Sequence, residues 1–138
     1  MNASAEAFLE RLARHEIRYK ETAQPDGSHL VAIEMAGQNG ALYNVVLVFS
    51  PDGMEAGVRI FQLGHVPTER QRPMLRTLNA INGEYAWLRF YLDSDSDVAA
   101  AMDGVLTPGT AAKVCWEMLV RAFSVLDAVQ EKIDAVLK

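Results

Sequence analysis

Apolar and polar residues alternate with a period of two over most of residues 17–63, which predicts β-strands rather than helices. The alternation breaks at two Pro-Asp-Gly turns, 25–27 and 51–53, and at the Gly-Gln-Asn-Gly sequence 37–40. Proline presets φ and glycine accepts positive φ, so each break predicts a tight turn. The segment therefore predicts four antiparallel strands. Its third strand, 43–49, is apolar on both faces, and we expect it to be central and covered on both sides.

Three other stretches carry the period near 3.6 that is typical of amphipathic helices, at about 5–15, 69–82 and 110–137. Ser4 is the expected N-cap of the first helix. The second is expected to end at Asn82-Gly83, where glycine can adopt the left-handed conformation that stops a helix.

Alternation returns at 85–92 and 97–103, on either side of an Asp/Ser turn, and predicts a second hairpin. The order is then helix, four strands, helix, two strands, helix. Because helices and strands do not alternate strictly, we predict an α+β fold with a mostly antiparallel sheet. A length of 138 residues fits a single domain over residues 1–138.

The charge balance restricts the partners. The formal net charge is −5, whereas nucleic-acid and anionic-membrane binding draw on clustered lysine and arginine, so we expect neither partner. No apolar run approaches the roughly 18 residues that span a bilayer. Glu6 and Glu10 interrupt the N-terminal segment, which does not match a secretory signal. The single cysteine, Cys115, fits a reducing compartment, and a cytoplasmic protein is expected.

The residues that could carry chemistry are scattered. His15, His29 and His65 have no zinc-ligand spacing, and Cys115, which lies among apolar residues of a predicted helix, is expected to be buried and inert. No carboxylate pair, phosphate loop or nucleophile motif is present. We therefore predict no catalytic residue, no metal and no cofactor.

Residues 93–97, Asp-Ser-Asp-Ser-Asp, match the first five positions of a calcium loop. The sixth position should be glycine but is Val98, and the twelfth should be glutamate but is Gly104. A solvated hairpin turn is the expected structure.

Two groups of residues are candidates for a partner surface. Trp116, Val120 and Phe123 widen the apolar stripe of the last helix, and they form either a dimer or client surface or plain core under the sheet. The second group is Arg70, Arg72 and Arg76, which with Arg59 and Arg89 could form a patch for an acidic peptide or a phosphoryl group, although ordinary solvated surface charge is the simpler explanation.

The segment Leu78–Gly83 leading into Trp87–Asp93, together with the element order, resembles the bacterial YbjN family of sensory-transduction regulators. The resemblance extends over roughly Glu6 to Leu126. It implies a fold similar to class I type III secretion chaperones, which dimerise and hold extended segments of client proteins. The function implied is a non-enzymatic interaction module, chaperone-like or regulatory, that binds a client or regulatory protein as a homodimer through one sheet face and the groove beside the second helix. Fold analogy alone supports that client binding.

A different class of function remains open. A small-molecule sensor or cryptic enzyme would need a pocket between sheet and helix, and Trp87, Tyr91 and Trp116 are its candidate wall residues.

Overall fold

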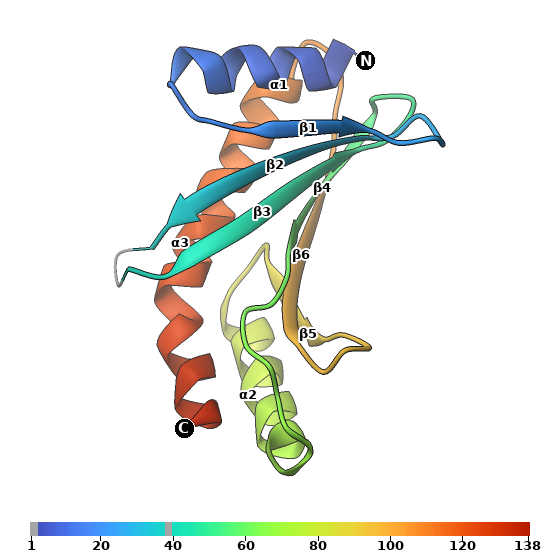
Figure 1. Ribbon diagram of the computed structural model, residues 1–138. Coiled ribbons are helices and arrows are strands. Elements are labelled where there is room, and N and C mark those ends of the chain that lie inside the picture. Colours follow the sequence, from blue (N-terminus) through green and yellow to red (C-terminus); the bar gives the residue numbers. More distant parts are fainter. Residues whose placement is uncertain (1–2, 38–39) are drawn as a thin grey trace.

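A six-stranded antiparallel sheet, in the order β1-β2-β3-β4-β6-β5, forms the centre of the fold (Figure 1). The structure is a computed structural model that describes residues 3–37 and 40–138. The four-strand meander and the second hairpin are both confirmed, and pairing between β4 and β6 joins them into one sheet. The strands are β1 (Lys20–Ala23), β2 (His29–Ala36), β3 (Leu42–Phe49), β4 (Glu55–Ile60), β5 (Arg89–Leu92) and β6 (Val98–Val105).

The described helices pack on one face of this sheet. They are α1 (Ala3–Arg14), the short 3-10 helix η1 (Thr68–Arg70), α2 (Gln71–Glu84) and α3 (Ala111–Leu137). In Figure 1, α1 crosses the N-terminal half of α3, and α2 lies beside the C-terminal half of α3. The predicted α+β order is therefore confirmed. None of the helices in the described part of the chain has the length and apolarity needed to cross a membrane.

The core lies between the sheet and the helices, and the strand period of two builds it. Val31, Leu47 and Val58 occupy one cross-strand row on the covered face and are fully buried. From α1, Phe8 packs on Phe49 of β3 with ring centroids 5.9 Å apart. The covered face thus uses every second residue of each strand.

The opposite face of the sheet carries no helix among the described residues, which corrects one prediction. Strand β3 is central, as expected, but it is covered on one side only. On its other side Leu42 is 66% exposed, and Val46 and Val48 are half-buried. We call this side the open face. The apolar residues on this face are not buried by the helices, because the three helices all pack on the other side.

Three local expectations also change. Ser4 does not cap α1 but lies inside it, buried, and its hydroxyl donates to the Gly53 carbonyl at 2.7 Å. Helix α2 begins at Gln71, near the expected start, but it passes through Asn82-Gly83 and ends at Glu84. Two residues of the expected turn at 37–40, Gln38 and Asn39, lie outside the described residues.

Candidate functional site

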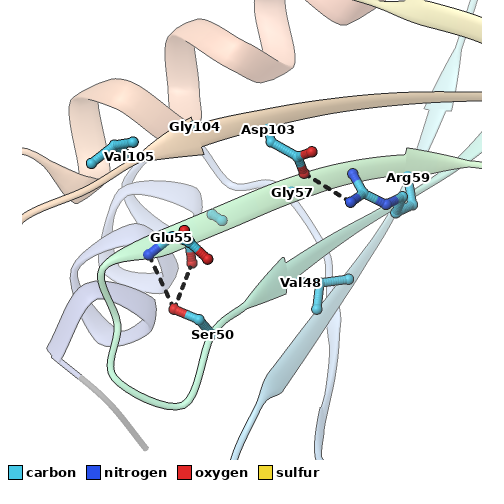
Figure 2. A pocket seen from close by; sticks show the side chains of 9 residues that line it. Val48, Ser50, Glu55, Gly57, Arg59, Asp103, Gly104 and Val105 are labelled. Carbon is cyan, nitrogen blue, oxygen red and sulfur yellow. Dashed lines mark hydrogen bonds and ion pairs between the residues drawn. The ribbon is translucent and has the colours of Figure 1, made fainter.

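A hollow of about 470 Å³ opens on the open face, over strands β3, β4 and β6 (Figure 2). It exists because Gly57 of β4 contributes no side chain at the centre of the face. Val48 borders the hollow from β3, and Val105 borders it from the end of β6. The nine residues that line it are Val48, Ser50, Glu55, Ala56, Gly57, Arg59, Asp103, Gly104 and Val105.

An ion pair lies across Gly57. The Arg59 guanidinium donates to the Asp103 carboxylate at 2.8 Å and to the carbonyls of Val58 and Met102 at 2.9 and 3.2 Å. A Cβ built on Gly57 would come within 2.7 Å of both charged groups. The glycine is therefore required for the pair to lie flat on the sheet. Because the Asp103 side chain is mostly exposed, the pair contributes little stability, but it fixes the position of the guanidinium.

The surroundings of the hollow are largely apolar. Val105 is 80% exposed, and Val46 and Leu30 are half-buried in the neighbouring strands. The nine lining residues include no histidine or cysteine. An apolar rim around the Arg59 guanidinium and the carboxylates of Asp103 and Glu55 has the composition of an interaction surface.

The predicted stripe of α3 is only partly available to a partner. Trp116 is half-buried, and its indole stacks on His15 with ring centroids 4.3 Å apart, below the Arg11 guanidinium. Phe123 meets Tyr43 edge-on at 6.4 Å. Val120, between these two residues, is 50% exposed. The aromatics therefore pack within the chain, and Val120 is the outermost residue of the stripe.

The three arginines lie elsewhere. Arg70, Arg72 and Arg76 are exposed on η1 and α2, and Arg70 donates to the carbonyl of Lys138 at 3.0 Å. Trp116 precedes Lys138 by 22 residues along α3, which at 1.5 Å per residue places them about 30 Å apart. The two predicted groups thus do not form one site. Between α2 and α3 lies the groove expected beside the second helix, a hollow of about 370 Å³ that the Lys132–Glu84 ion pair bridges at 3.3 Å.

The titratable groups occupy separate places. His29 faces Glu21 at 3.4 Å, and His65 bonds Asp97 at 2.8 Å. Burial raises the pKa of the Cys115 thiol to about 12, so the expected buried, inert thiol is confirmed. Within residues 3–37 and 40–138, no three histidine, cysteine or acidic side chains gather as a metal site.

The predicted hairpin turn at residues 93–97 is confirmed. The Asp93 carboxylate accepts the N–H groups of Asp95 and Asp97 at 2.9 and 3.0 Å. It therefore serves the turn itself, in the way that aspartate stabilises its own backbone.

The candidate wall residues of a pocket between sheet and helix do not come together. Trp116 packs against α1, Tyr91 lies on the open face, and Trp87 lies in the connection between α2 and β5. Sequence reasoning missed the role of that connection. Asn82 bonds both the N–H and the carbonyl of Phe90, at 2.9 and 3.0 Å, and so attaches β5 to α2. The only signal in the sequence was the position of Asn82 near a helix end, two residues before Glu84.

Comparison with known proteins agrees with this architecture. A family model described as "YbjN: Putative bacterial sensory transduction regulator" matches residues 4–135. A solved structure, "Crystal structure of YbjN, a putative transcription regulator from E. coli", superposes with a TM-score of 0.59 at 12% identity, and the match covers 93% of this chain and 92% of that one. No curated protein matches the sequence. The family model spans nearly the whole chain, and the protein therefore belongs to the YbjN family.

Proposed function

We propose that this protein is a non-enzymatic regulator that acts by binding a segment of a partner protein on the open face of its sheet. The observation that carries the proposal is the group of neighbouring apolar residues on that face, Leu30, Val46 and Val48 with Val105 beside the hollow, none of which the helices of the described chain cover. Contiguous exposed apolar surface on a folded domain marks an interaction site.

The face suits a partner better than the two edges of the sheet do. Strands β1 and β5 form the edges and have only four residues each, and β1 carries Lys20 and Glu21. Short, charged edge strands oppose the addition of another strand. On the open face, by contrast, Arg59 and Asp103 offer a fixed donor and acceptor within an apolar rim. A partner segment there would gain apolar contact and one oriented polar contact.

A homodimer is the assembly we propose, with Val120 at the centre of the contact. Symmetric dimers are the commonest oligomers, and Val120 is the exposed residue of a helix flank that Trp116 and Phe123 stiffen. Arg70, Arg72 and Arg76 lie on the helix side, so an acidic stretch bound there would make a second contact, and Arg70 would exchange its bond to the Lys138 carbonyl for it. Holding a client segment in the manner of type III secretion chaperones is one form this binding can take.

The test is capture of partners from the native cell with matched variants. Val105→Glu places a charge on the open face, and Leu75→Glu places the same charge on an exposed apolar position of α2, 53% exposed. We expect proteins that wild type captures to be lost with Val105→Glu and retained with Leu75→Glu. Equal capture by both variants would refute the open face as the binding surface. Light scattering tests the dimer independently: we expect the molar mass of a dimer for wild type and of a monomer for Val120→Glu. A wild-type monomer at high micromolar concentration would refute the dimer.

A further inference from the structure

A second hollow, separate from the open face, lies between Trp87 and the first half of α3. Its volume is about 460 Å³. Apolar contact comes from Trp87, Val114 and Met118, and the polar side chains lie at its margin. We call it the Trp87 groove. It is lined by Trp87, Thr110, Lys113, Val114, Glu117, Met118 and Arg121.

Trp87 is held in a strained and exposed position. The N–H of Leu88 donates to the Ala86 carbonyl at 3.0 Å, which closes a three-residue γ-turn around Trp87 with φ +77°. This turn, with positive φ at its centre, is rare and strained, and a bulky residue there is an outlier. Trp87 is nevertheless 58% exposed. Strain of this kind persists where the surroundings enforce it, often beside a binding site.

The enforcing contacts are local. Asn82 holds Phe90 through two hydrogen bonds, and Arg89 donates to the Tyr85 carbonyl at 3.0 Å. The Arg121 guanidinium lies over the indole, 5.0 Å from the ring centroid. The connection is therefore fixed on both sides of Trp87, and the ring is presented in one orientation.

The charges at the margin leave one cation unpaired. Arg121 is paired with Glu117 one turn earlier on α3. Lys113, in the first turn of the helix, forms no ion pair within the described part of the chain. An apolar groove with a single available ammonium group complements a molecule with an apolar body and one negative charge.

The size of the groove favours a small molecule over a protein. Seven residues line it, whereas a stable protein interface uses roughly 20–30 residues a side. Its volume lies in the range of small-molecule sites, about 300–1,000 Å³. Met118, a flexible side chain packed against Gly104, can adapt to different apolar shapes.

We propose that the Trp87 groove binds a small amphipathic carboxylate, with its apolar body against Trp87, Val114 and Met118 and its carboxylate at the Lys113 ammonium. This ligand site is independent of the partner surface proposed above. The occupant is an aliphatic or aromatic monoacid with a body long enough to reach from the helix end to the indole.

Two signals in the full chain report on binding of octanoate as the test ligand. The chain has two tryptophans, so Trp116→Phe leaves Trp87 as the sole tryptophan, which can be excited selectively at wavelengths that the four tyrosines do not absorb. We expect a saturable change in its fluorescence with octanoate and at least about tenfold weaker binding of octanol and octylamine, which lack the carboxylate. In otherwise unaltered protein with labelled methionine methyl groups, the NMR signal of Met118 should move and that of Met74, buried in α2, should not.

Matched lysine variants test whether the Lys113 ammonium binds the ligand carboxylate. Lys113→Ala should weaken octanoate binding at least about tenfold, while Lys20→Ala, on the edge strand β1, should leave it unchanged. Equal binding of octanoate and octylamine, a Met118 signal that stays fixed at saturating octanoate, or an unchanged affinity in Lys113→Ala would each overturn the proposal.

Discussion

The covered and open faces of the sheet are built from alternate residues of the same strands, yet they differ in how much of their apolar surface the fold uses. In β3, Val45 and Leu47 point to the helices and are buried, whereas Val46 and Val48 point away and stay half-buried. These four residues of β3 are nearly alike, so their unequal burial comes from where the helices pack. In β4 the sequence itself also differs between the faces, with Val58 on the covered side and Glu55 and Arg59 on the open side.

This contrast separates stability from function. Apolar residues on the covered face contribute the transfer free energy of full burial. On the open face the same residue types keep part of their surface in water, and that free energy becomes available when a partner covers them. If this division is right, equivalent substitutions on the two faces should have unequal costs.

Neighbouring valines of β3 give the sharpest form of the comparison. Val45→Ala removes methyl groups from the core, and we expect the free energy of unfolding to fall by about 2–3 kcal/mol, because lost burial and a cavity both contribute. Val46→Ala should cost less than about 1 kcal/mol. Urea unfolding followed by circular dichroism measures both. Equal losses would mean that the open face is covered in solution, for instance by a second copy of the chain.

Two glycines, one on each face, allow the cost of an added methyl group to be compared between the covered and the open face. On the covered face, a Cβ on Gly104 would meet the sulfur of Met118 at 2.6 Å, and because Met118 is only 6% exposed it must shift within the packed core, so Gly104→Ala should destabilise the protein by about 1–3 kcal/mol. On the open face, a Cβ on Gly57 would meet only the ends of the Arg59 and Asp103 side chains, which can swing into solvent. Gly57→Ala should therefore unfold within about 1 kcal/mol of wild type in the same assay. A larger loss for Gly57→Ala than for Gly104→Ala would contradict the assignment of the faces.

The element order and the covered face could be predicted from the sequence, because each depends on a local period. Val31 and Ile33 on β2, or Met74 and Leu78 on α2, are buried as their spacing predicts. The coverage of β3 could not be predicted in this way. An apolar residue such as Val48 has the same sequence signature whether a helix or a future partner covers it.

The candidate site was harder to predict, because exposure depends on contacts between distant elements. Trp116 and Trp87 look alike in the sequence, but Arg11 of α1 and His15, which follows that helix, cover the first, and a γ-turn exposes the second. The hollow at Gly57 needs Arg59 and Asp103 on neighbouring strands, 44 residues apart in the sequence. Such a pairing follows only once the register of β4 with β6 is known.

Substitution of Asn82 tests how helix α2, on the covered side, is joined to strand β5 at the edge of the sheet. Its side chain bonds both backbone groups of Phe90, and these groups lie at the start of β5, the last strand on that edge. Asn82→Ala leaves a donor and an acceptor of the half-buried backbone without their partners, and should lower the free energy of unfolding by about 1–2 kcal/mol. Asn79, one turn earlier and exposed on the same helix, is the matched control, and Asn79→Ala should change the free energy of unfolding by less than about 0.5 kcal/mol.

Hydrogen exchange should locate the Asn82 effect in β5 and in the connection that carries Trp87, while the β2–β3 amides stay protected. If exchange instead accelerated evenly across the sheet, β5 would be part of the same cooperative unit as β3, and the strain at Trp87 would be held by the whole fold rather than by this one side chain.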